Sequence, residues 1–253
     1  MLLSIIIPIY NEESFIDMVI KKINSARLSG NIHKEIILIN DGSTDQTNKR
    51  LQQYNNDPAI KIFHQDTNKG KTAAVKLGIQ QSQGDIILIQ DADLEYDPDD
   101  YQALLEPIIT SRARVVYGSR FKGTIDNMSL INRFANIISN MTFNFLFRTR
   151  LTDINTCYKV FKKEVLKDPA ITSKRKFTFD TEITAKLVQW GYTIYEVPIR
   201  YVARSKQEGK KITWKDALEM YWAIIQYGVA LHEKDYSFNA KSAMLAPVTN
   251  KTK

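Results

Sequence analysis

The sequence predicts an α/β protein built on a doubly wound, mostly parallel β-sheet. Short apolar runs rich in β-branched residues recur through the first 120 residues, and they do not alternate with polar residues. Such runs are typical of strands that are buried on both faces, as in a parallel sheet. Amphipathic stretches of helical period separate the runs, so strand and helix alternate along this part of the chain.

The predicted elements of this part follow one another closely. We predict buried strands over residues 4–10, 35–40, 59–64, 85–90 and 114–119. We predict helices between them over residues 12–28, 44–55, 70–82 and 98–112. Pro98 stands where the last of these helices begins, a position at which proline is favoured. The acids beside it suit the positive end of a helix dipole, and they are Asp97, Asp99 and Asp100.

Residues 128–148 have a different character, because asparagine recurs there at every fourth position opposite a line of apolar side chains. This pattern predicts a strongly amphipathic helix or a pair of helices. The asparagines are Asn132, Asn136, Asn140 and Asn144. The apolar face consists of Ile131, Phe134, Ile138, Met141 and Phe145. That face either packs on the rest of the protein or lies at a bilayer interface, with the asparagine stripe and Arg133 toward water or headgroups.

The remaining elements complete a single expected domain over residues 1–232. The predicted strands cover residues 156–161 and 193–202, and the predicted helices cover residues 180–190 and 213–232. Residues 233–253 show no periodicity, so we predict a disordered tail there.

The composition limits the cellular setting and the kinds of partner. A net charge of +7 and a pI of about 9.2 admit nucleic acid, an anionic membrane surface or a phosphorylated substrate. The single cysteine, Cys157, excludes an internal disulfide framework and fits a reducing compartment. No apolar run reaches the length of about 18 residues that predicts a membrane-spanning helix. The N-terminus also lacks the features of a signal peptide, so we expect a cytoplasmic protein.

Six carboxylates crowd into residues 91–100 of this basic chain, so their mutual repulsion must be offset. Asp91 follows a predicted buried strand, and open α/β sheets bind ligands at that end of their strands. Asp91 and Asp93 alternate along an extended chain, so both can face one site, and Glu95 could follow them. Hard oxygen ligands at this spacing suit Mg²⁺ or Mn²⁺ together with a ligand diphosphate. A solvated acidic loop is the alternative.

Polar clusters also follow the first two predicted strands, as "PIYNEE" over residues 8–13 and "NDGSTD" over residues 40–45. Three such clusters at neighbouring strand ends would form one crevice. Asp41 is placed to bond a ribose or a base, as an acid after the second strand does in dinucleotide-binding folds. Helix capping is an additional or alternative use of Asn11, Ser43 and Thr44.

Six segments together resemble glycosyltransferase family 2, and most of all its polyprenyl- (dolichyl-) phosphate mannose and glucose synthase branch. They occur in the family's order within residues 1–232, as "SIIIPIYNEE", "INDGSTD", "NKGKTAAVKLG", "DADLEYDPDDY", "VYGSRF" and "EVPIRYVAR". The resemblance implies a GT-A type fold, a nucleotide-sugar donor, Mg²⁺ or Mn²⁺ at an Asp-x-Asp-type motif, and inverting transfer. It also implies a nucleotide-sugar-binding half over residues 1–120 and an acceptor-binding half over residues 121–232.

The same resemblance gives individual residues expected roles. The residues expected to bind the donor are Pro8, Tyr10, Glu12, Asp41, Lys71 and Asp91. The expected metal ligands are Asp91, Asp93 and Glu95, the last where the synthase branch often has Gln. The residues expected to meet an acceptor phosphate are Arg120, Arg133 and Arg204. The expected catalytic set is Asp93, Arg120, Arg133, Asp180 and Glu182.

The identity of the acceptor stays open between two chemistries. A polyprenyl phosphate arrives anionic, since a phosphate monoester has its second pKa near about 6, and it needs positive charge rather than a strong base. A saccharide hydroxyl needs a general base, for which Asp180 and Glu182 are candidates. A basic nucleic-acid-binding module is the hypothesis from a different class, but the acidic crevice would repel a phosphate backbone, so we expect no nucleic-acid partner.

A polyprenyl phosphate is held in a membrane, so this hypothesis requires a membrane surface as a partner. We expect peripheral association with the inner face of a membrane through residues 128–148 and the basic loop 204–211. Recruitment by a separate membrane protein is the other route.

Overall fold

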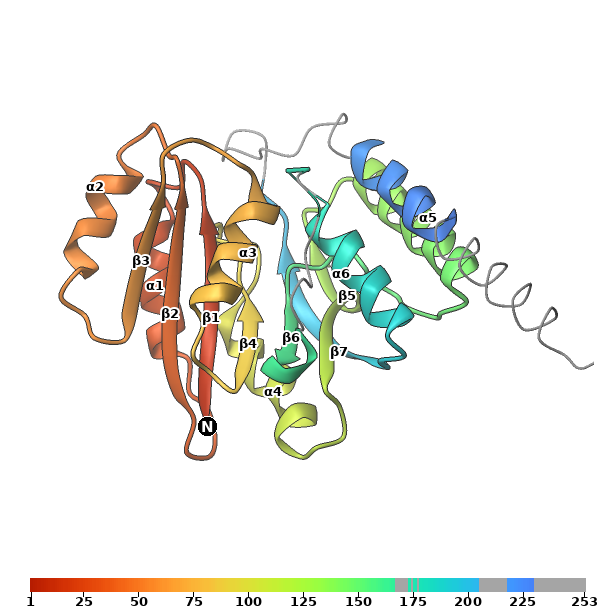
Figure 1. Cartoon of the computed structure of the whole chain (residues 1–253), viewed down its shortest axis with the longest axis horizontal. Helices are drawn as coiled ribbons and strands as arrows, with labels where there is room; N and C mark the ends of the chain where they lie inside the picture. The colour runs from red at the N-terminus through yellow and green to blue at the C-terminus, as the bar shows by residue number, and fades with distance from the viewer. Residues whose placement is uncertain (167–172, 174, 177, 205–217, 230–253) are drawn as a thin grey trace, which may run out of the picture.

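Seven strands form one sheet in the order β3-β2-β1-β4-β6-β5-β7 (Figure 1). The structure is a computed structural model, and it describes residues 1–166, 173, 175–176, 178–204 and 218–229. The strands are β1 Leu2–Ile9, β2 His33–Asp41, β3 Ile60–Gln65, β4 Ile86–Ile89, β5 Val115–Asp126, β6 Lys159–Lys162 and β7 Ile194–Val202. The helices are α1 Ile16–Ser25, α2 Thr47–Leu51, α3 Lys71–Gln81, α4 Tyr101–Ile109, α5 Leu130–Phe147 and α6 Phe179–Gln189. Short 3₁₀ turns are η1 Gln52–Tyr54, η2 Pro98–Asp100 and η3 Lys163–Val165.

The first four strands are parallel neighbours, as their unbroken apolar runs predict. Ile5 at the centre of β1 lies opposite Ile36 on β2 and Leu88 on β4. All three side chains are buried, because α3 and α6 cover one face of the sheet and α1 and α4 cover the other (Figure 1). The predicted α/β class is confirmed.

The sheet differs from a simple doubly wound order because β6 lies antiparallel between β4 and β5. Phe161 of β6 pairs with Ile87 on one side and Val115 on the other. A strand from late in the chain therefore separates two strands that are consecutive in sequence. The strand predicted over residues 156–161 begins only at Lys159, because the preceding residues bond to side chains of other elements.

α5 and the helix over residues 218–229 lie side by side at one end of the molecule (Figure 1). Thr142 Oγ1 and the Tyr221 hydroxyl are 3.3 Å apart across this contact. A second hydrophobic cluster lies beneath the two helices, and its buried members are Phe143, Phe147, Leu151, Ile154, Ala185 and Ile224. Among the residues that the structure describes, no helix combines the length and the hydropathy needed to cross a membrane.

Parts of three predictions lie outside the described residues. These parts are the two ends of the helix predicted over residues 213–232, the basic loop beyond Arg204, and the tail 233–253. The acid-rich stretch behaves as predicted at its end, since the Asp97 side chain accepts a hydrogen bond from the Asp99 amide and caps η2 ahead of Pro98.

Candidate active site

The three polar clusters predicted at strand ends meet at one edge of the sheet, because β2, β1 and β4 are parallel neighbours. The loops after β1 and β2 are bonded directly to each other. The Asn11 amide donates to Ser43 Oγ at 3.0 Å, and the Thr44 amide donates to Asn11 Oδ1 at 2.7 Å. These side chains therefore join the two loops rather than cap the helices that follow them.

Asp41 ends β2 and holds the loop that leads into α3. Its carboxylate accepts hydrogen bonds from the backbone amides of Lys69 and Gly70, each at 2.7 Å. Burial raises the pKa of Asp41, although both amides oppose that change. Gly70 has φ of +90°, and a Cβ there would lie 2.5 Å from Lys176, so this turn requires glycine. Pro8 on β1 and Tyr10 after it lie half-buried at the same edge.

Lys71, the first residue of α3, lies between two carboxylates, one from the acidic motif after β4 and one from α6. Its Nζ lies 2.8 Å from Asp91 Oδ1 and 3.9 Å from Asp180 Oδ2. Burial alone would raise the pKa of Asp91, but Lys71, together with Cys157 and Arg204, outweighs burial and lowers the pKa of that carboxyl. The other oxygen of Asp180 lies 2.5 Å from Nζ of Lys159, which is fully buried. Asp180 is therefore a paired carboxylate between two lysines.

Arg204, just beyond β7, lies among three other carboxylates at this edge of the sheet. Its guanidinium is 2.9 Å from Asp93 Oδ2 and 3.1 Å from Glu12 Oε2. Its backbone amide donates to Glu95 Oε1 at 2.9 Å, while the Tyr201 hydroxyl donates to the other oxygen of Glu95 at 2.8 Å. Burial, Asp91 and Glu95 together raise the pKa of Asp93 to about 8, against the opposing effect of Arg204.

The predicted metal ligands are not assembled as a metal site. Within the described ranges, no three His, Cys, Asp or Glu side chains are grouped so that they could hold a metal ion. Instead, Asp91 contacts Lys71 and Asp93 contacts Arg204. The residue types still fit a hard divalent cation, since carboxylate oxygens are its preferred ligands. The pKa of Asp93 is raised because Arg204, the positive charge beside it, does not offset the effects of burial and of the neighbouring carboxylates.

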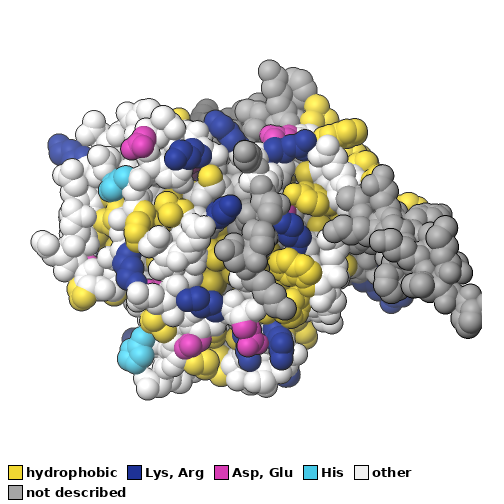
Figure 2. All heavy atoms as spheres, viewed as in Figure 1, with side chains coloured by type: hydrophobic (Ala, Val, Ile, Leu, Met, Phe, Trp, Pro, Cys, Tyr) yellow, Lys and Arg dark blue, Asp and Glu magenta, His cyan; other side chains and the backbone are white. Residues whose placement is uncertain are grey.

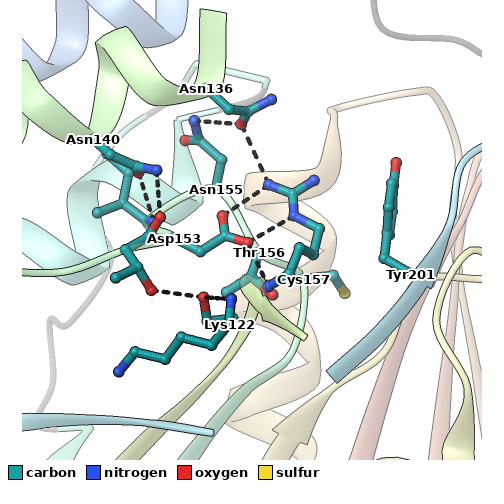
Figure 3. Close-up of polar contacts among 12 residues, drawn as sticks. Lys122, Asn136, Asn140, Asp153, Asn155, Thr156, Cys157 and Tyr201 are labelled. Carbon is teal, nitrogen blue, oxygen red and sulfur yellow. Dashed lines mark hydrogen bonds and ion pairs between the residues drawn. The ribbon is translucent and has the colours of Figure 1, made fainter. Parts of the chain in front are cut away.

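Arg120 on β5 is buried and is held by Asp153, which Figure 3 shows beside Asn136 and Asn155. Its Nε donates to Asp153 Oδ2 at 2.7 Å and its Nη2 donates to Oδ1 at 2.8 Å. The guanidinium carbon lies 5.0 Å from the centre of the Tyr201 ring. Glu196 of β7 fixes the loop that carries Asp153, because its Oε1 accepts from the Asp153 amide at 3.0 Å.

Asp153 is a site residue that the sequence analysis missed. It is fully buried, and it is the only charged residue of the stretch "LTDINTCY" over residues 151–158. A lone acid in an otherwise uncharged stretch is a weak signal, but it could have been paired with one of the predicted arginines.

Two residues of the predicted catalytic set, Glu182 and Arg133, lie apart from the charged residues described above. Glu182 on α6 is fully buried, and it accepts from the Ser173 amide at 3.1 Å and contacts Lys186 Nζ at 2.8 Å. Arg133 on α5 is exposed and lines an apolar surface depression together with Phe134 and Ile137. Arg120 and Arg133 thus lie on β5 and α5, which follow one another in the chain, and in the described part of the structure their side chains make no direct contact.

The prediction that the asparagine stripe of α5 faces water is wrong. Asn140 Nδ2 donates to the Thr152 carbonyl at 2.5 Å, and its Oδ1 accepts from the Ile154 amide at 3.0 Å. The Asn144 side chain donates through Nδ2 to the Leu151 carbonyl at 2.8 Å, and its Oδ1 accepts from the Leu151 amide at 2.9 Å. The stripe is turned inward because the loop before β6 has backbone groups that need partners. The apolar face is consequently the exposed one.

The mixed seven-stranded sheet, with polar side chains gathered after β2, β1 and β4, has the GT-A type fold of solved glycosyltransferases. Glucosyl-3-phosphoglycerate synthase from Mycobacterium tuberculosis, crystallised with Mn²⁺ and UDP, matches with a TM-score of 0.68 at 16% identity over 90% of this chain and 79% of that chain. Residues 4–168, more than half of the chain, match the model of glycosyl transferase family 2, and the chain belongs to this family.

Two curated relatives have names that specify polyprenyl-type phosphates. The dodecaprenyl-phosphate galacturonate synthase of Rhizobium johnstonii is 28% identical over 65% of this chain and 49% of its own length. The dolichol-phosphate mannosyltransferase of Pyrococcus furiosus is 27% identical over 83% of this chain and 59% of its own length. The chain therefore spans about half to three-fifths of the length of these relatives.

Proposed function

We propose that this glycosyltransferase transfers a sugar, with inversion, from a nucleotide-sugar donor to a polyprenyl phosphate at a membrane surface, and that the reaction depends on Mg²⁺ or Mn²⁺. The observation that carries the proposal is the state of charge of the residues predicted to meet the acceptor. Arg120 offers a fixed guanidinium there, whereas Asp180 is paired with Lys159 and Lys71. A phosphate acceptor needs the cation, and a hydroxyl acceptor would need a free carboxylate as its base.

The comparisons support both substrates. The names of two relatives contain dodecaprenyl phosphate and dolichol phosphate, and a solved structure of the same fold holds UDP and Mn²⁺. The carboxylates after β4 are of the type that holds such an ion, and Asp41 at the end of β2 is the acid that we assign to the nucleoside.

The chemistry assigned to the chain follows from these positions. Asp91 and Asp93 would hold the divalent ion, which when bound stabilises the charge that develops on the departing nucleoside diphosphate. Lys71 adds positive charge beside Asp91. Arg120 orients the acceptor phosphate, whose oxygen forms the new bond to the sugar carbon as the bond to the diphosphate breaks on the opposite side. The sugar carbon is oxocarbenium-like at that point, so nearby carboxylates also lower the barrier.

The exposed face of α5 supports the membrane setting. Its large apolar side chains with substantial exposure are Leu130, Ile131, Phe134, Ile137, Ile138, Met141 and Phe145. Hydrophobic side chains gather at the upper right of the space-filling view, where α5 begins and the helix over residues 218–229 lies beside it (Figure 2). Arg133 lies among them, so an anionic bilayer surface would meet apolar and basic groups together. We propose that this face docks on the inner face of a membrane.

A donor and acceptor screen tests the proposal. GDP-mannose, UDP-glucose and UDP-N-acetylglucosamine are each offered with Mn²⁺ or Mg²⁺ and a short polyprenyl phosphate, and the product is a sugar-phosphate lipid identified by mass spectrometry. The matched acceptor control is the same polyprenol without its phosphate, and a chelator provides the metal control. Transfer to a saccharide hydroxyl but not to the lipid phosphate would overturn the proposal, and full turnover with chelator would remove its metal requirement.

A further inference from the structure

The side chain of Asn136 bridges α5 and the predicted acceptor arginine. Its Oδ1 accepts a hydrogen bond from Arg120 Nη2 at 3.3 Å and another from Asn155 Nδ2 at 3.1 Å (Figure 3). Its own Nδ2 donates to the Asn132 carbonyl at 2.8 Å. Both ends of the amide are therefore engaged, which fixes its orientation.

The contacts of Arg120 leave one edge of the guanidinium available. Nε and one hydrogen of Nη2 go to Asp153, and the second hydrogen of Nη2 goes to Asn136. Within the described part of the chain, no residue accepts a hydrogen bond from Nη1. A guanidinium has five donors in a rigid plane, so fixing three of them sets the direction of the other two.

The same helix also fixes Asp153, the main partner of Arg120. Asn140, one turn after Asn136, bonds the Thr152 carbonyl and the Ile154 amide, which are the residues on either side of Asp153. α5 therefore supports the Arg120–Asp153 pair in two ways: Asn136 bonds Arg120 directly, and Asn140 bonds the loop that carries Asp153. The exposed apolar face of α5 lies on the opposite side of this helix.

We propose that Asn136 is a positioning residue for the acceptor phosphate, acting through Arg120. Its carbonyl oxygen holds Nη2 in place, so that the two hydrogens of Nη1 are directed toward the incoming phosphate. Asn136 thereby links the helix that carries the apolar surface to the group that binds the headgroup of the lipid. This inference rests on the proposed function, because it assumes a phosphate acceptor.

The test compares Asn136→Ala with Asn132→Ala in the full-length protein. Asn132 lies one turn earlier in the same stripe. Its side chain bonds to no described residue, so it controls for shortening an asparagine on α5. The readouts are the KM for a short polyprenyl phosphate, the affinity for the nucleoside diphosphate with Mn²⁺ by calorimetry, and the melting temperature. The net worth of one typical hydrogen bond, acting on the phosphate only through Arg120, predicts an acceptor KM raised about three- to tenfold in Asn136→Ala alone.

A second variant separates positioning from folding. Asn136→Asp keeps an oxygen facing Arg120 but adds a negative charge beside the phosphate site, so the acceptor KM should rise more than in Asn136→Ala, by about tenfold or more. Nucleoside diphosphate affinity and melting temperature should stay near those of the wild type in both variants. An unchanged acceptor KM in both, or equal changes in Asn132→Ala, would overturn the inference. A wild-type protein that glycosylates only a hydroxyl would overturn the proposed function, and this inference with it.

Discussion

Arg120 and Asp153 determine which substitutions can test the acceptor site. Both side chains are buried, and their contact is bidentate. Replacing Arg120 by alanine would leave Asp153 as a buried carboxylate without its counter-charge, which costs about 3–5 kcal/mol in the free energy of unfolding. An effect of that variant on transfer would mix loss of fold with loss of phosphate binding.

Arg120→Lys is the sharper variant, because lysine keeps the charge but lacks the planar fork. One ammonium cannot reproduce both bonds to Asp153 and still present donors to a phosphate. We expect the KM for polyprenyl phosphate to rise by about tenfold or more, which corresponds to a loss of about 1.4 kcal/mol, within the range for charge-assisted hydrogen bonds. Steady-state kinetics with both substrates varied measure this. A raised donor constant with an unchanged acceptor constant would assign Arg120 to the donor side.

Asp93 should make the stability of the metal-free protein depend on pH. Its pKa of about 8 in the folded state lies above the usual value near about 4, so the folded chain binds the extra proton between those values. Stability contributed by this group is present at low pH and is lost as pH rises through about 4 to 8. With chelator present, the melting temperature of Asp93→Asn minus that of the wild type should therefore increase between pH 5 and pH 8.

Asp99→Asn is the control for that experiment, because Asp99 is an exposed acid of the same stretch. Its melting temperature should follow that of the wild type across the same pH range. Parallel curves for all three proteins would show that Asp93 is not the source of the pH dependence.

At the scale of single residues, the sequence locates the carboxylates but not the cations that face them. Asp91 follows β4, and its position at a strand end can be predicted from the buried run before it. Its contact with Lys71 and that of Asp93 with Arg204 join residues 20 and 111 positions apart. Such pairs depend on where whole elements pack, which no local pattern records.

At the scale of elements, α5 shows a limit of periodicity. The spacing of Asn132, Asn136, Asn140 and Asn144 predicts a helix with two unlike faces, and that helix is confirmed. The spacing does not say which face is buried. Asn140 is buried because the loop before β6 offers unpaired backbone groups, whereas Phe134 and Phe145 are 65% and 84% exposed. The antiparallel insertion of β6 has the same kind of cause, since strand pairing is a contact between distant residues.

The exposed face of α5 gives a direct test of membrane binding. Phe134→Asp/Phe145→Asp should reduce co-sedimentation with anionic vesicles, since the two substitutions place charges where an apolar face would enter the bilayer interface. The melting temperature should change little, because both rings are exposed. Met18→Asp controls for a charge placed on an exposed apolar residue of another helix. A folded double variant that pellets as the wild type does would exclude α5 as the anchor.

At the scale of the whole molecule, Arg204 connects a late part of the chain to the loops that follow the first strands of the sheet. This residue follows β7, the edge strand farthest from β3, yet it contacts Glu12 after β1 and Asp93 after β4. The stretch Glu95–Tyr96 adds to this closure, because the Val202 amide donates to the Glu95 carbonyl at 2.9 Å and the Tyr96 and Tyr201 rings lie 5.1 Å apart. Contacts of Arg204 and Tyr201 therefore join the end of β7 to the loops after β1 and β4, at the carboxylates that we propose hold a cation.

Arg204→Met tests whether this closure and a divalent cation use the same carboxylates. Without the guanidinium, Asp93 and Glu12 lose a nearby positive charge, so the variant should melt at a lower temperature than the wild type when chelator is present. Added Mn²⁺ should then raise its melting temperature more than that of the wild type, because the ion no longer competes with Arg204. A tenfold tighter affinity for Mn²⁺ would add up to about 1.4 kcal/mol of stabilisation at saturating ion. Titration of free Mn²⁺ by electron paramagnetic resonance measures that affinity without turnover, and equal affinities in the two proteins would show that Arg204 and the ion do not compete.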